Sequence, residues 1–170
     1  MKKIAVALFS IAAIISMSSA IMDTKCESKS LKKEGIAELN PFYYSASKVT
    51  EIDFQYKSSR REIEVPLFKG ERYKMVFNKK GLPKDVVVEI FDKDKSHSNR
   101  KAVFTSVGNA AKILSYSPEK SKNMFIRYTI PKANGETESG CMVFVLGYQL
   151  TFIGNDEDKH KETESATESE

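Results

Sequence analysis

Leu67–Asp92 reads LFKGERYKMVFNKKGLPKDVVVEIFD, and the alternation of its apolar residues decides the fold class. A period of two is typical of a strand that buries one face. The apolar rows are Tyr73, Met75 and Phe77 in the first half and Val86, Val88 and Ile90 in the second. Gly81 and Pro83 stand between the two rows and favour a turn. We therefore predict a hairpin of two strands in this stretch.

Similar alternation recurs in short segments on both sides of this stretch. The further predicted strands are Thr50–Tyr56, Glu62–Phe68, Lys101–Thr105, Ala111–Tyr116, Asn123–Ile130 and Gly140–Phe152. Pro66 cannot donate a hydrogen bond to a neighbouring strand, so its segment should lie at a sheet edge or carry a bulge. About eight short strands predict an all-β fold, an antiparallel β-sandwich of the jelly-roll or Ig-like kind. A partly open barrel is the alternative.

The last predicted strand, Gly140–Phe152, is apolar on both faces. One face carries Met142, Phe144, Leu146, Tyr148, Leu150 and Phe152, and the other carries Cys141, Val143 and Val145. A strand of this kind is typically central and covered on both sides. We therefore expect both faces of its first half to be covered, and we expect Phe144, Leu146 and Tyr148 to be core residues.

The segments outside the sandwich differ from it in composition. Residues 1–20 combine two lysines, an apolar run and a small-residue end, which predicts a signal peptide cleaved after Ala20. Residues 21–41 form a polar N-terminal arm, expected to be mobile or a single helical turn because Gly35 interrupts a faint helical spacing. Residues 42–154 form the β-sandwich domain, and 155–170 an acidic tail expected to be disordered.

These features predict an exported protein, either periplasmic or secreted. No other apolar run is long enough to cross a membrane, so no transmembrane segment is expected in the mature chain. The net charge of the whole chain is +4, and the two lysines of the leader and the net −5 of the tail leave about +7 on residues 21–154. The basic residues are scattered and not interleaved with aromatic ones, so we expect a solvated surface and no nucleic-acid partner.

Two cysteines, Cys26 and Cys141, are the candidate site residues of the chain. In an exported protein they can form one disulfide that closes most of the domain into a loop. The alternative is two separate thiols, with Cys141 buried as a small apolar residue. The spacing of the residues in the sequence does not decide between these alternatives.

The sequence offers little that suggests catalysis. No nucleophile elbow, zinc-binding helix or phosphate-binding glycine loop is present, and we predict no catalytic residue, cofactor or metal. His97 is the one histidine within the sandwich domain and lies in a polar loop. Asp92–Ser96 resembles the start of a calcium loop, but His97 and Val103 occupy the positions that need glycine and glutamate. Glu62 and Glu64 are expected on a solvent-facing strand surface.

Three phrases resemble small exported proteins of unassigned function from Bacteroidetes-type bacteria. They are IEVPLF at Ile63–Phe68, FNKKGLP at Phe77–Pro83 and GCMVFVLGY at Gly140–Tyr148. The resemblance covers roughly Phe42 to Tyr148. It implies a bacterial periplasmic or secreted domain and brings no activity or site residue with it.

Together these observations predict an exported, non-enzymatic accessory or binding domain. Its ligand would be a protein or a glycan, bound through loops or a sheet face. A first alternative is a hydrolase assembled from residues distant in the sequence, with His97 beside an acid and a hydroxyl. A second is a structural component of an envelope complex that docks through the edge strand near Pro66.

Overall fold

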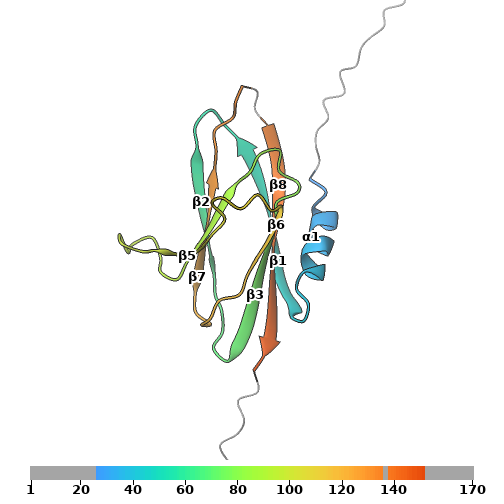
Figure 1. Cartoon of the computed structure of the whole chain (residues 1–170), viewed down its shortest axis with the longest axis vertical. Coiled ribbons are helices and arrows are strands. Elements are labelled where there is room, and N and C mark those ends of the chain that lie inside the picture. Colours follow the sequence, from blue (N-terminus) through green and yellow to red (C-terminus); the bar gives the residue numbers. More distant parts are fainter. Residues whose placement is uncertain (1–25, 136–137, 152–170) are drawn as a thin grey trace, which may run out of the picture.

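The protein is a sandwich of two four-stranded sheets with one helix on its outside (Figure 1). A computed structural model describes residues 26–135 and 138–151. Its elements are α1 (Ser28–Ala37), β1 (Tyr43–Phe54), β2 (Ser59–Val65), β3 (Glu71–Asn78), β4 (Val87–Phe91), β5 (Ala102–Thr105), β6 (Ile113–Tyr116), β7 (Met124–Ile130) and β8 (Glu138–Leu150).

All strand pairs are antiparallel, and the strand order is that of a jelly roll. One sheet has the order β1-β8-β3-β6 and the other β2-β7-β4-β5. Most connections between consecutive strands therefore cross from one sheet to the other. The predicted all-β sandwich is confirmed. The two sheets are separate rather than joined into the barrel that was the alternative.

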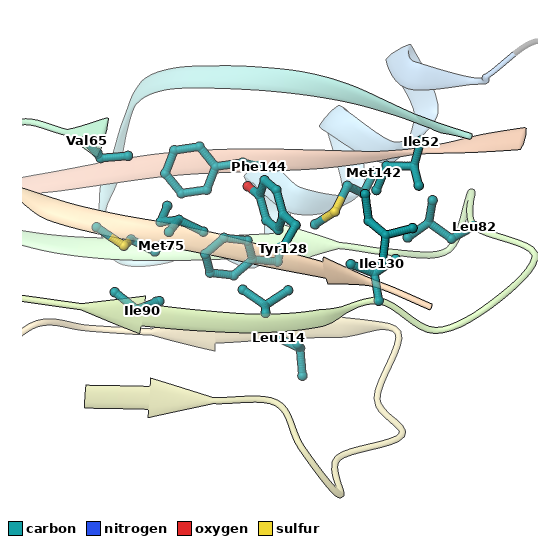
Figure 2. Close-up of a cluster of buried hydrophobic side chains, with 14 of the residues drawn as sticks. Ile52, Val65, Met75, Leu82, Ile90, Leu114, Tyr128, Ile130, Met142 and Phe144 are labelled. Carbon is teal, nitrogen blue, oxygen red and sulfur yellow. The ribbon is translucent and has the colours of Figure 1, made fainter. Parts of the chain in front are cut away.

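The core lies between the two sheets and is made by the alternating rows that the sequence contains. Figure 2 shows Ile52 from β1, Met75 from β3 and Tyr128 from β7 among the side chains that fill this space. Phe144 and Leu146 of β8 are buried in the same cluster, and Tyr148 is packed against it and partly buried. The predicted core positions of Phe144 and Leu146 are therefore confirmed, whereas Tyr148 is only partly buried, Leu150 is exposed and Phe152 lies outside the described residues.

The hairpin predicted for Leu67–Asp92 is wrong, although its apolar rows are right. β3 belongs to the first sheet and β4 to the second, so the chain arches over the core between them. Leu82 and Val86 are buried in the core, which anchors this connection to the interior. Lys79 is fully buried and its ammonium nitrogen lies 2.6 Å from Oδ1 of Asp85. Two strands with buried faces can cover each other across a sandwich as well as lie side by side.

The prediction of a mobile arm or a single turn before the sandwich is also wrong. The ten-residue helix α1 lies on the outer face of the sheet that contains β8, away from β2 and β7 (Figure 1). Leu31 and Leu39 pack there against Val143 and Val145. Nδ2 of Asn78 also donates to the Leu31 carbonyl at 3.0 Å. The predicted coverage of both faces of β8 is thus confirmed, and α1 supplies the second cover.

β2 is an edge strand and ends immediately before Pro66, as the missing N–H of proline predicts. The predicted signal peptide and the acidic tail lie outside the described residues. No helix in the described part of the chain has the length and apolar character needed to cross a membrane.

Candidate functional site

A cleft opens where the edge strands β1 and β2 of the two sheets face each other. Its volume is about 470 Å³, within the range of roughly 300–1,000 Å³ that small-ligand sites occupy. We call it the β1–β2 cleft. The residues that line it are Lys48, Val49, Thr50 and Glu51 of β1, Arg61, Glu62 and Ile63 of β2, and Tyr128 of β7.

The cleft forms because the inward-facing rows of both edge strands change from apolar to polar. In β1 the row that begins with the buried Phe54 and Ile52 continues with Thr50 and Lys48. These last two lie opposite Met142 and Phe144 of β8, so they share the core side of the sheet. In β2 the row of Val65 and Ile63 continues with Arg61, which lies opposite Tyr128. The apolar core thus ends before this edge of the sandwich.

Two buried hydroxyl groups in the cleft have no hydrogen-bond partner within the described residues. They are Oγ1 of Thr50 and the phenolic oxygen of Tyr128. Tyr128 is fully buried, and its burial raises the pKa of the phenol, which therefore keeps its proton near neutral pH. Buried polar groups are nearly always hydrogen-bonded, so two unsatisfied hydroxyls that line one cleft indicate a place for a polar ligand.

The charged side chains on the core side of the cleft are both cationic. Neither Lys48 nor Arg61 forms an ion pair in the described part of the chain. Nη1 of Arg61 donates to the carbonyl oxygen of Glu51 at 2.8 Å, which ties β2 to β1 and uses one of the five guanidinium donors. The carboxylate of Glu51 does not share their side of the sheet, because Glu51 lies opposite Cys141 on the face that α1 covers.

Glu62, at the rim of the cleft, is already engaged on the outer face of the second sheet. Its carboxylate accepts hydrogen bonds from Arg100 at 3.1 and 2.5 Å and from Nε of Arg127 at 3.3 Å. The Arg100 contact is the main reason why the pKa of Glu62 lies below its ordinary value. Both guanidinium groups also lie over the ring of Phe91, at 4.2 and 4.5 Å from its centroid. Glu62 therefore belongs to an ion-pair cluster rather than to the open solvent-facing surface predicted for it.

The cleft at the opposite edge of the sandwich, beside β5 and β6, has a different character. It has a volume of about 440 Å³, and Asp92, Tyr116 and Lys122 are among its lining residues. Its charges are partly neutralised within the chain, because Nζ of Lys122 lies 2.7 Å from Oδ2 of Asp92. No unsatisfied buried hydroxyl is found among its described lining residues. The β1–β2 cleft is therefore the stronger candidate for a binding site.

His97 does not lie in any of these clefts. It is exposed in the loop between β4 and β5, with Nδ1 at 3.3 Å from Oδ1 of Asp94 and 3.4 Å from Oγ of Ser96. Both contacts are on the same ring nitrogen, and the Ser96 hydroxyl also donates directly to Asp94 at 2.5 Å. A catalytic triad needs the acid and the hydroxyl on opposite ring nitrogens. These contacts stabilise a loop turn.

The calcium-like loop carries no constellation of metal ligands. Within residues 26–135 and 138–151, no group of three or more His, Cys, Asp or Glu side chains is placed to hold a metal ion. In the same loop Oδ1 of Asp94 accepts from the backbone N–H of Ser96 at 2.7 Å. The carboxylate of Asp94 is thus used to form the turn, and that of Asp92, which opens the stretch, is paired with Lys122.

Cys26 and Cys141 are joined by a disulfide in the structure. Their Cα atoms lie 5.5 Å apart, and 115 residues separate them in sequence. Cys26 lies two residues before the start of α1 and Cys141 is near the start of β8, so the bond fixes the helix to the sheet. The bond lies on the helix-covered face of the sheet, the face opposite to the core side that carries Lys48 and Thr50.

Sequence reasoning missed the β1–β2 cleft, although two signals for it are present. The predicted strand at Thr50–Tyr56 begins too late, and extending its inward row backward adds Thr50 and Lys48 to Ile52 and Phe54. A lysine on an otherwise apolar row is a departure from simple alternation. The predicted strand at Glu62–Phe68 also begins too late, because Arg61 lies within β2 and faces inward.

Comparison with known proteins finds a likeness in structure but none in sequence family. No protein-family model matches the chain, and no curated protein matches it. Among solved structures, the chain is similar to Aeromonas hydrophila PliG, a periplasmic lysozyme inhibitor of g-type lysozyme. The two sequences are 11% identical, and the TM-score is 0.40. The match covers 63% of this chain and 88% of the PliG chain.

Proposed function

We propose that the protein is an exported, non-enzymatic binding domain that holds its ligand in the β1–β2 cleft. The observation that carries the proposal is the pair of unsatisfied hydroxyls of Thr50 and Tyr128 in one cleft. A buried hydroxyl without a partner costs roughly 1–3 kcal/mol in folding free energy. Such a cost at two neighbouring positions is typical of a site that exchanges stability for binding.

The lining residues favour binding over chemistry. None of the described residues that line the cleft is a histidine, cysteine or aspartate. Of its two carboxylates, Glu62 is engaged by arginines and Glu51 faces the other side of the sheet. Threonine becomes a nucleophile only beside a base that can take its proton, and no such base lies on the core side of the cleft. The set is suited to hydrogen bonding and charge recognition.

Export is supported by the disulfide as well as by the leader-like first 20 residues. A disulfide between Cys26 and Cys141 persists in the periplasm or outside the cell and is reduced in the cytosol. The bond that ties α1 to β8 therefore supports the proposed compartment.

A fragment screen by NMR tests the proposed site without knowledge of the natural ligand. ¹⁵N-labelled protein is mixed with a set of neutral, anionic and cationic small molecules at constant ionic strength. We expect at least one charge class to shift the backbone amides of residues 48–51 and 61–63 in a saturable way. The double variant Thr50→Val/Tyr128→Phe keeps the shape of both side chains, and we expect it to lose these shifts.

A matched control keeps the result specific to the cleft. Ser47→Ala removes a hydroxyl from the opposite, helix-covered face of β1. Tyr73→Phe removes a phenolic hydroxyl from another part of the core. These variants should bind as the unaltered protein does. If no fragment of any charge class shifts the cleft amides, the protein does not bind its ligand there and the proposal is wrong.

A further inference from the structure

We propose that the β1–β2 cleft recognises a carboxylate group, carried by an acidic peptide side chain or an acidic sugar. This inference rests on the proposed function and adds the chemical class of the ligand. Its components are the cations Lys48 and Arg61 and the hydroxyls of Thr50 and Tyr128.

The electrostatics of the cleft select a negative group. Lys48 and Arg61 are the charged residues on the core side of the cleft, and neither is neutralised by an ion pair in the described residues. The two carboxylates at the rim do not cancel them, since Glu51 lies on the helix-covered face and Glu62 is bound by two arginines. A ligand in the cleft therefore meets uncompensated positive charge.

The geometry of the donors suits a carboxylate. A guanidinium group offers parallel N–H donors that match the two oxygens of a carboxylate, and such charge-assisted bonds are about twice as strong as neutral ones. The contact of Nη1 with the Glu51 carbonyl positions Arg61 at the mouth and leaves further N–H groups for a ligand. The hydroxyls of Thr50 and Tyr128 belong to residues that line the same cleft, and neither has a hydrogen-bond partner in the described part of the chain.

Phosphate is a less suitable occupant for this cleft. Phosphate sites commonly rely on backbone N–H groups at the start of a helix or in a glycine-rich turn. The cleft is lined by strand residues, with no glycine and no helical residue among them. Its recognition groups are side chains, and two of them, Lys48 and Arg61, are long and exposed.

The test is a set of NMR titrations in 0.15 M salt, which screens weak surface attraction. The probes are acetyl-Gly-Glu-Gly-amide, its Gln counterpart, a galacturonic-acid trisaccharide, the neutral galactose trisaccharide and inorganic phosphate. We expect one or both acidic organic probes to shift the amides of residues 48–51 and 61–63. Each should bind at least about tenfold more tightly than its neutral counterpart, which is the contribution of one charge-assisted hydrogen bond. Binding by the peptide alone or by the sugar alone identifies the source of the carboxylate.

Charge-removing variants with matched controls complete the test. Arg61→Gln and Lys48→Gln should each raise the dissociation constant of the acidic probe about tenfold. Arg60→Gln removes the same charge from the opposite face of β2, and Lys57→Gln removes it from the preceding turn. These two variants should change the dissociation constant of the acidic probe by no more than about twofold. Equal effects of the paired variants would mean general charge attraction and would overturn the inference.

The failure of this inference differs from the failure of the proposed function. If a neutral or cationic fragment binds the cleft and the acidic probes do not, the cleft is a binding site but not a carboxylate site. Tighter binding of phosphate than of either acidic organic probe also overturns the carboxylate assignment. If no probe or fragment shifts the cleft amides, both proposals are wrong.

Discussion

The hydroxyl of Tyr128 lies between the two sheets and has no hydrogen-bond partner among the described residues, which makes a sharp prediction at the scale of one residue. Tyr128→Phe removes the oxygen without leaving a large cavity. Because an unsatisfied buried hydroxyl costs roughly 1–3 kcal/mol, the variant should be as stable as the unaltered protein or more stable by about 1 kcal/mol. Urea unfolding followed by circular dichroism measures the change in unfolding free energy.

Tyr73→Phe is the control, because that hydroxyl is satisfied. It accepts from the backbone N–H of Phe68 at 3.2 Å and donates to Glu71. Its removal should lower the unfolding free energy by about 1 kcal/mol. A loss of more than about 1 kcal/mol in Tyr128→Phe would instead show that the Tyr128 hydroxyl has a structural partner, and would remove the main support for the binding site.

Glu62 gives a prediction of pH dependence. Hydrogen bonds from Arg100 are the main cause that lowers its pKa below the ordinary value of 4.5, and the nearby charges of Arg100 and Arg127 add to them. The folded protein therefore holds this carboxylate ionised to lower pH than the unfolded chain does. Its contribution to stability is complete above about pH 4.5 and is lost as the pH falls through the lowered pKa. In the Glu62→Gln variant, the unfolding free energy should fall less steeply as the pH is lowered through this window.

Glu64→Gln is the matched control for this effect. Glu64 lies two residues further along β2 on the same face, is exposed, and forms no ion pair in the described residues. Denaturant unfolding at a series of pH values from 3 to 7 should show the unaltered slope in this variant. An equal slope in the unaltered protein and in Glu62→Gln would contradict the assigned role of the Arg100 contact.

At the scale of elements, α1 depends on the absence of a side chain at Gly35. A Cβ atom added there would lie 2.8 Å from Cγ2 of Val145, closer than such atoms approach in proteins. Replacing glycine by alanine in a helix ordinarily stabilises it by about 1 kcal/mol. Here the overlap with Val145 should reverse the sign, and we expect Gly35→Ala to lose roughly 1–3 kcal/mol.

A double-mutant cycle with Val145→Ala checks the cause of this loss. The smaller side chain makes room for the added methyl group, so Gly35→Ala should be neutral or stabilising in that background. Thermal and urea unfolding of the four proteins measures the coupling free energy. If Gly35→Ala stabilises the otherwise unaltered protein, α1 does not pack on β8 as closely as the structure has it.

Gly35 also explains why the helix was not predicted from the sequence. In a single sequence, a glycine amid weak helical spacing resembles an interruption, whereas in the structure it is a point of close approach between the helix and Val145 of the sheet. The apolar outer face of β8, with Val143 and Val145, indicated that this face is covered. It did not indicate which segment of the chain covers it. Alternation along one strand predicts which residues are buried and is insensitive to which segment buries them.

The same limit accounts for the other differences. The rows of Met75 and Val88 were assigned correctly, but pairing within a hairpin and facing across a sandwich bury the same residues. The β1–β2 cleft depends on Lys48 and Arg61 being brought together from strands in different sheets, which no local pattern contains. The cysteines could be named as candidates from composition, while their approach to 5.5 Å between Cα atoms is a property of the fold.

For the whole molecule, the disulfide links the fold to the compartment in which it forms. The bond closes a loop of 115 residues, and removing a disulfide from a small exported domain typically costs about 2–5 kcal/mol. Cys26→Ala/Cys141→Ala should therefore lower the unfolding free energy by about this amount. We expect α1 to lose more local stability than the sandwich does. The bond attaches this helix, and the helix adds few apolar side chains of its own to the cluster on β8.

Hydrogen exchange distinguishes a local loss from a general one. Amides of α1 should exchange much faster in the double alanine variant than in the unaltered protein. Amides of β4 and β7 should exchange only when the whole sandwich unfolds, so their rates should rise only by the general loss of stability.

Protein purified from an oxidising compartment should show no free thiol in denaturant without reductant. Two titratable thiols would contradict both the bridge and the proposed export. A variant with slow exchange in α1 would instead show that Leu31, Leu39 and the Asn78 hydrogen bond suffice to hold the helix on the sheet.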